Sequence, residues 1–132
     1  MYTPLFNEFL ASNDTLRIYK DGQLIFSSTE DRLFPLLEYI SRFASHQKQV
    51  VVFDKIMGNA AALLSIKADC QDVYSPLGSE IAARTLETYG INYQINEIVP
   101  YIRQVDSEEM CPMEKLSLDK SPEEFYEAVV YA

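Results

Sequence analysis

The residues best suited to chemistry stand where predicted strands run into predicted helices. They are Asp54, Lys55, Gly58, Asn59, Ser79, Glu80, Cys111 and Glu114. The first four follow the apolar run Val50 to Phe53, which is typical of a strand buried on both faces. A helix that starts just after such a strand presents free N–H groups at the strand's carboxyl end, where α/β proteins commonly bind ligands. The pattern therefore predicts a ligand site at this junction.

Gly58, Asn59, Ser79 and Glu80 are predicted to line the ligand-binding crevice. Two helix amino termini, near Gly58 and near Ser79, would bind a phosphate or a carboxylate through their main-chain N–H groups. Gly58 would let a ligand or another segment of backbone come close. A purely structural interpretation stays open, in which Asp54 and Lys55 form an ion pair, Ser79 caps a helix, and the small residues allow close contact between helix and sheet.

Cys111 is the candidate for covalent or redox chemistry. Pro112 after it predicts a helix start, and the positive end of a helix dipole stabilises a thiolate. Glu114 is expected to fold back on the Cys111 backbone as in a capping box, although a carboxylate close to the sulfur would disfavour the thiolate. Asp54, Lys55 or Glu114 would then transfer protons or orient a substrate. Alternatively, Cys111 is a small buried hydrophobic residue.

Composition narrows the class of protein. A chain of 132 residues is one domain by size, and its 20 acidic and 11 basic residues give a net charge of −9. Phosphate backbones and anionic lipid surfaces would be repelled, so neither nucleic acid nor membrane is expected as a partner, while a small local basic pocket is not excluded. No apolar run is long enough to span a membrane, the first residues lack an export signal, and two cysteines make no disulfide framework. A cytoplasmic location is expected.

Alternating elements predict an α/β fold. The first half is predicted to contain a helix capped by Thr3, a hairpin turning at Asp21-Gly22, a helix over 33–44, a strand over 50–53 and a helix over 58–67. The second half is predicted to contain a strand at 73–74, a helix over 79–89 stopped by Gly90, and a strand over 91–95. An irregular stretch over 97–110, a helix from Pro112 and a closing helix over 122–131 with a capping box are predicted to follow. Together they predict a three-layer α/β/α sandwich around one mixed sheet that begins with an antiparallel hairpin.

The chain resembles the cytidine-deaminase-like fold in this order of elements. Asp72 to Ala82 is similar to the segment in which zinc deaminases carry a Pro-Cys-x-x-Cys motif. A closer resemblance, spanning Leu16 to about Leu116, is to a family of small bacterial proteins of unknown function that is assigned the same fold. It rests on Phe34-Pro35-Leu36-Leu37-Glu38, Asp54-Lys55, Gly58 with Ala60-Ala61-Ala62, Ser79-Glu80 and Cys111-Pro112-Met113-Glu114. The resemblance implies a fold and brings no established activity.

The chain departs from the deaminases at their metal ligands. A zinc deaminase needs three Cys or His ligands and a glutamate that moves protons. Here Leu77 and Glu80 match the two cysteines, Gly58-Asn59-Ala60 stands in place of His-x-Glu, and His46 lies in a predicted loop. We therefore expect no zinc and no other cofactor. The favoured function is a metal-free module that binds a small anionic or nucleotide-like ligand without turning it over. A cysteine-dependent enzyme or redox sensor using Cys111 is the alternative, and homo-oligomeric assembly stays open.

Overall fold

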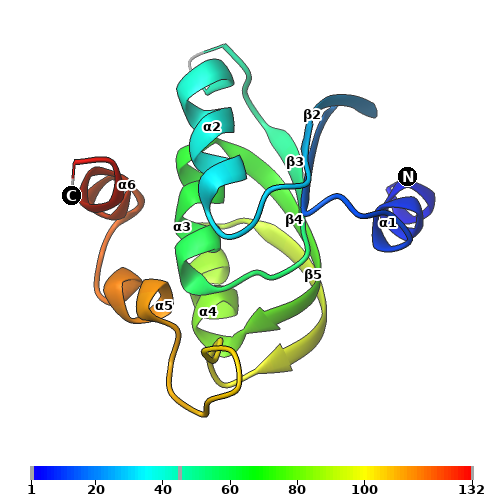
Figure 1. The fold of residues 1–132 in the computed structure, drawn as a ribbon. Coiled ribbons are helices and arrows are strands. Elements are labelled where there is room, and N and C mark those ends of the chain that lie inside the picture. The colour runs from blue at the N-terminus through cyan, green and yellow to red at the C-terminus, as the bar shows by residue number, and fades with distance from the viewer. Residues whose placement is uncertain (1, 45, 132) are drawn as a thin grey trace.

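The computed structural model describes residues 2–44 and 46–131, whose strands form one mixed sheet (Figure 1). The strands are β1 (Leu16–Lys20), β2 (Gln23–Ser28), β3 (Val50–Asp54), β4 (Cys70–Ser79) and β5 (Asn92–Val99). Their order in the sheet is β2-β1-β3-β4-β5. β1 is antiparallel to both β2 and β3, whereas β4 is parallel to β3 and to β5. The mixed α/β class predicted from the sequence is confirmed.

The opening hairpin forms as its sequence predicts. Asp21 and Gly22 make the two-residue connection between β1 and β2, and both have positive φ angles, 50° and 82°. Asp-Gly tolerates this backbone conformation, whose twist matches that of the flanking strands. The hairpin puts β1 beside β3, and β3 is thereby enclosed between β1 and β4 in the middle of the sheet.

Helix α1 (Thr3–Leu10) covers one face of the sheet (Figure 1). Its Phe6 and Phe9 are buried with Val51 and Phe53 of β3. The sequence suggests Thr3 as the helix cap, but the helix already includes Thr3, and Tyr2 is the N-cap with no side-chain cap hydrogen bond. This prediction was wrong because proline favours the first turn of a helix without requiring a particular cap before it.

Three helices cover the other face: α2 (Phe34–Phe43), α3 (Asn59–Lys67) and α4 (Glu80–Thr88). Every residue of α3 from Asn59 to Ser65 is buried. A helix that is buried all round needs small or apolar side chains on every side, and the run Ala60-Ala61-Ala62 meets this need. The predicted starts of α3 and α4 and the stop at Gly90, whose φ is +71°, are confirmed.

Two further helices, α5 (Pro112–Ser117) and α6 (Pro122–Val130), lie outside α3 on the side away from the sheet (Figure 1). Phe125 of α6 is fully buried in the main core, and Ser121 and Glu124 form the predicted capping box. Helices therefore lie on both faces of the sheet as expected, but those on the α3 side form two layers. The helices of the described part are all too short or too polar to cross a membrane.

Strand β4 is much longer than the predicted pair 73–74. Pro76 and Gly78 both lie in the half of β4 that pairs only with β5 and with the isolated bridge at Met57. A proline is tolerated in a strand where it does not have to donate to a neighbour. β5 likewise extends to Val99, so the irregular stretch starts later than predicted.

We predict that α6 is an integral part of the core. Phe125→Ala would leave a cavity against α3 and is expected to lower the free energy of unfolding by about 3–4 kcal/mol. Urea denaturation followed by circular dichroism measures the change. Val130→Ala, on the exposed part of the same helix, is the matched control and should change stability by less than about 0.5 kcal/mol. Equal effects of the two substitutions would show that α6 does not complete the core.

Candidate functional site

The amino termini of α3 and α4 lie side by side, at the place predicted for the crevice. Met57, just before α3, connects them: its N–H donates to the Leu77 carbonyl at 2.8 Å, and its carbonyl accepts from the Ser79 N–H at 3.1 Å. Gly58 is the N-cap of α3, and Ser79 is the N-cap of α4, with its hydroxyl accepting from the Ala82 N–H at 3.0 Å. The interpretation of Ser79 as a helix cap is therefore confirmed.

The crevice between these helix starts is filled by the carboxylate of Glu114, which comes from α5. Glu114 is only 2% exposed. Its Oε1 accepts hydrogen bonds from the Asn59 N–H at 2.5 Å and from the Ser79 hydroxyl at 3.3 Å, while its Oε2 accepts from the Ile102 N–H at 2.5 Å. The chain thus supplies its own anion to the N–H groups that we expected to bind a ligand.

Gly58 permits this arrangement by its lack of a side chain. A Cβ atom at this position would lie 3.0 Å from Ile102 Cγ1 and 3.3 Å from Glu114 Oε1. Contacts this short would push Ile102 or the carboxylate out of place. The close approach predicted at Gly58 is therefore real, and the groups that approach are the chain's own Ile102 and Glu114.

The Asn59 side chain joins three helices around the same crevice. Its Nδ2 donates to the Ser117 hydroxyl at 3.0 Å, and its Oδ1 accepts from the Thr85 hydroxyl at 2.5 Å. The Ser117 hydroxyl in turn donates to the Glu114 carbonyl at 2.6 Å. Thr85 and Ser117 were missed by the sequence analysis. Only the spacing of Ser117 three residues after Glu114 hinted that the two residues act together.

Asp54 is the last residue of β3 and Lys55 follows it, and their side chains have different partners. The Lys55 ammonium donates to the Ser12 carbonyl at 2.9 Å and lies 4.7 Å from the centre of the Phe9 ring, on the α1 side. Asp54 Oδ1 accepts from the Ile56 N–H at 3.2 Å. The suggested ion pair between them was wrong, because the Lys55 ammonium is held at the Ser12 carbonyl while Asp54 accepts from the Ile56 main chain.

Asp54 is a partly buried carboxyl group that accepts its hydrogen bond from the main-chain N–H of Ile56. Burial raises its pKa from 3.8 to about 7, and the hydrogen bond from Ile56 opposes this rise. A group with this pKa changes its charge in the neutral pH range, which suits proton transfer. Asp54 is not part of the hydrogen-bonded cluster around Glu114, so its predicted catalytic role stays a prediction.

Glu80 lies outside the crevice. Its side chain is about half exposed, and its nearest ionic partner is Arg84, one helical turn later, at 3.9 Å. Of the four residues predicted to bind a ligand, Gly58, Asn59 and Ser79 contact or surround the Glu114 carboxylate, whereas Glu80 faces solvent. Its binding role is not supported by contacts with the crevice.

Cys111 is the N-cap of α5 and is partly exposed. Its N–H donates to the Ile102 carbonyl at 2.8 Å, so the predicted capping box with Glu114 was wrong. The Glu114 carboxylate accepts from three donors in the crevice, whereas a capping box would offer it only the Cys111 N–H, so the crevice is the more favourable position. Cys70 is also free, but burial raises its thiol pKa to about 12. Reactivity at Cys111 stays a prediction.

The crevice suits an anion rather than a cation. The Asn59 and Ile102 N–H groups both point at one carboxylate. A metal ion binds atoms that offer a lone pair, and an N–H group offers a positive hydrogen instead, so these groups would repel a cation. Within residues 2–44 and 46–131, no cluster of three or more His, Cys, Asp or Glu side chains could hold a metal. The residues present at the crevice therefore do not fit the zinc centre of a deaminase.

We predict that the charge and shape of Glu114 both stabilise the fold. Glu114→Gln would place an amide N–H₂ against the N–H groups of the crevice and is expected to cost about 3 kcal/mol of unfolding free energy. Urea denaturation measures this cost. Glu127→Gln, which makes the same charge change on an exposed part of α6, is the control and should stay within about 0.5 kcal/mol. A neutral Glu114→Gln would mean that the crevice does not depend on the carboxylate.

We also predict a pH-dependent cost from Asp54. The pKa of Asp54 is higher in the folded protein than in the unfolded chain, so the native state holds this proton more tightly. The stability that results is complete below about pH 4 and is lost as the pH rises to about 7. Asp54→Asn, which keeps the acceptor for Ile56, should therefore stabilise the protein by about 2 kcal/mol near pH 8, with partial exposure taken into account, and hardly at all near pH 4. Denaturant unfolding over this range measures the difference. A benefit that does not vary with pH would contradict the prediction.

Comparisons with known proteins identify a family. A family model described as a domain of unknown function (DUF1893, TM1506) matches residues 5–130. The crystal structure of a DUF1893 family protein (TM1506) from Thermotoga maritima is similar at 29% identity and a TM-score of 0.87, covering 97% of this chain and 86% of that chain. None of the curated proteins compared with the chain matches it. The chain thus belongs to the DUF1893 family of domains of unknown function.

Proposed function

We propose that this chain is a non-catalytic module with a cytidine-deaminase-like fold, whose crevice binds a small anionic or nucleotide-like ligand in exchange for Glu114. The order of elements supports the fold assignment: an opening helix, a hairpin and two strand-to-helix units around the sheet order β2-β1-β3-β4-β5. The crevice lies at the carboxyl ends of the parallel strands β3 and β4, where open α/β sheets bind ligands.

The observation that carries the proposal is the carboxylate already bound in the crevice. The donors around Glu114 are the Asn59 N–H at the start of α3, the Ser79 hydroxyl at the start of α4 and the Ile102 N–H. A carboxylate or phosphate oxygen of a ligand would find the same donors and the same positive ends of two helix dipoles. The site is thus built for an anion, and Glu114 is the competitor that a ligand has to displace.

Displacement requires α5 to withdraw from α3. The hydrogen bonds that hold it come from the Glu114 carboxylate, from the Asn59 side chain to Ser117, and from Cys111 to Ile102, and Met113 also packs against the main core. Because Glu114 is tethered, its effective concentration at the crevice is high, on the order of millimolar or more. A simple anion competes poorly with it, so a natural ligand must also contact groups beyond the carboxylate position, such as the amide of Asn59.

Removing the competitor provides a direct test. Glu114→Ala leaves an empty space the size of a carboxylate, and free acetate is expected to enter it and raise the melting temperature by roughly 4 °C more than chloride at equal ionic strength. Glu127→Ala, with its exposed position, should respond equally to both salts. Thermal unfolding followed by circular dichroism measures the difference between the salts.

A second measurement uses the unmodified chain, in case Glu114→Ala folds poorly. Inorganic phosphate and adenosine monophosphate are titrated into ¹⁵N-labelled protein, and the amide signals of Asn59, Ser79 and Ile102 are followed. Saturable shifts at these three amides support exchange with Glu114. If acetate rescues no more than chloride does and neither phosphate compound shifts these amides, the crevice is a closed structural element and the proposed function is wrong.

A further inference from the structure

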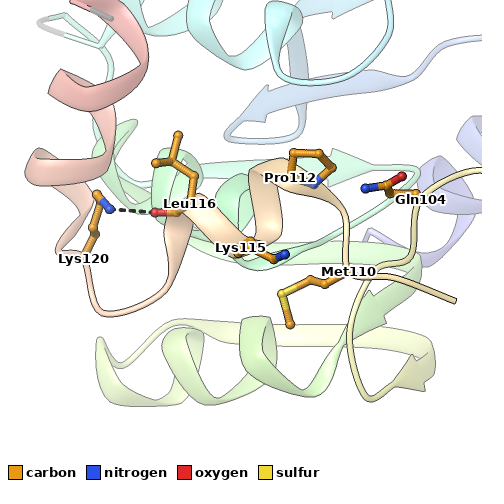
Figure 2. A pocket seen from close by; sticks show the side chains of 6 residues that line it. All are labelled: Gln104, Met110, Pro112, Lys115, Leu116 and Lys120. Atoms are coloured by element: carbon orange, nitrogen blue, oxygen red, sulfur yellow. Dashed lines mark hydrogen bonds between the residues drawn. The ribbon is translucent and has the colours of Figure 1, made fainter. Parts of the chain in front are cut away.

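A cavity lies on the side of α5 that faces away from the crevice. Its volume is about 440 Å³, and it is lined by Gln104, Met110, Pro112, Lys115, Leu116 and Lys120 (Figure 2). At 100° per residue, Pro112 and Leu116 project from α5 on the side opposite Glu114. One short helix thus closes the crevice with its inner side and forms a wall of this cavity with its outer side.

The walls of the cavity are held in place by main-chain and side-chain hydrogen bonds. Arg103 and Met110 form a β-bridge, and the Gln104 N–H donates to the Glu109 carbonyl at 2.9 Å, so the loop over 100–111 folds back on itself. On the other side, the Lys120 ammonium donates to the Leu116 carbonyl at 2.8 Å (Figure 2). This bond keeps the charge of Lys120 at the edge of the cavity.

The charges around the cavity are sorted by sign. From residue 106 to residue 131 the chain has eight acidic residues and two lysines. Both lysines line the cavity, and no acidic residue does. Neither lysine forms an ion pair with a carboxylate of the described residues. Lys120 interacts electrostatically with Glu124, whereas no carboxylate in the described part of the chain faces Lys115 at ion-pair distance. In a chain with a net charge of −9, two lysines beside a concave surface mark a place where a small anion is attracted.

The remaining lining residues are mostly apolar. Met110, Pro112 and Leu116 contribute hydrocarbon and sulfur surface, and Gln104 adds one amide (Figure 2). Methionine adapts its shape to different apolar partners. A mainly apolar surface with a few polar groups is typical of small-molecule sites, and the volume lies within their usual range of roughly 300–1,000 Å³.

We propose that this cavity binds an amphipathic organic anion. Its carboxylate or phosphate head lies at the Lys115 ammonium, Lys120 adds positive charge beside Leu116, and its apolar body lies on Met110, Pro112 and Leu116 (Figure 2). The two lysines provide the attraction, and the apolar surface selects against inorganic ions. The site shares no side chain with the crevice, although α5 forms a wall of both, and its test does not rest on the proposed function.

Octyl phosphate, used below its micelle concentration, is the probe, and isothermal titration calorimetry measures its affinity for the whole chain. Inorganic phosphate, which has no apolar body, and 1-octanol, which has no charge, are expected to bind at least tenfold more weakly. Lys115→Gln and Lys120→Gln should each weaken octyl phosphate binding by roughly fivefold to tenfold, and Leu116→Ser by a similar factor. Lys48→Gln, an exposed lysine at the opposite end of β3 from the crevice, is the matched control and should leave the affinity unchanged.

All four substituted residues carry exposed or partly exposed side chains, so the variants are expected to fold, which circular dichroism verifies. Binding of octyl phosphate that is the same in the lysine variants and in Lys48→Gln overturns the proposal. So does 1-octanol binding as tight as that of octyl phosphate, since it would show an apolar surface without charge selection. Acetate rescue of Glu114→Ala is unaffected by either result, so this site and the proposed function can fail separately.

Discussion

The structure depends on one buried carboxylate and the N–H groups that surround it. A carboxylate taken out of water is tolerated only when several donors replace its hydration. Glu114 finds such donors at Asn59, Ser79 and Ile102, which belong to α3, to α4 and to the segment after β5. Each of these segments is therefore held in a fixed position relative to α5. The same charge accepts the N–H at the start of α3 and the Ser79 hydroxyl that caps α4, so it pairs donors at the beginnings of two helices.

The central position of α3 explains why this arrangement is required. The helix has the sheet beneath it, α2 and α4 beside it, and α5 and α6 above it. No part of its first two turns reaches water. The N–H groups at its start cannot be solvated, so they need an internal acceptor, and the chain provides one from far along the sequence. Small residues at Ala60, Ala61 and Ala62 let all these neighbours approach closely.

Features controlled by neighbouring residues could be predicted from the sequence, whereas contacts between distant residues could not. The turn at Asp21-Gly22, the start of α4 at Ser79 and the capping box at Ser121 each depend on a few consecutive side chains. The hydrogen bond from Asn59 to Glu114 joins residues 55 positions apart, and no periodicity reports such a pair. The same spacing that suggested a capping box at Cys111 was outweighed by a richer set of donors elsewhere. The second layer of helices on the α3 side was also missed, although α3 lacks the polar stripe of a helix with one exposed side.

The cover over α3 has a consequence for synthesis of the chain. The ribosome makes the chain from its amino terminus, so α3 is synthesised before the segment that carries Glu114 and Phe125. During that interval the outer side of α3 is an apolar surface with open N–H groups at its end, which is the kind of surface that holdase chaperones recognise and that causes aggregation. Completion of α5 and α6 removes this surface. The helices from Pro112 to Val130 thus supply the cover that a newly made α3 still lacks.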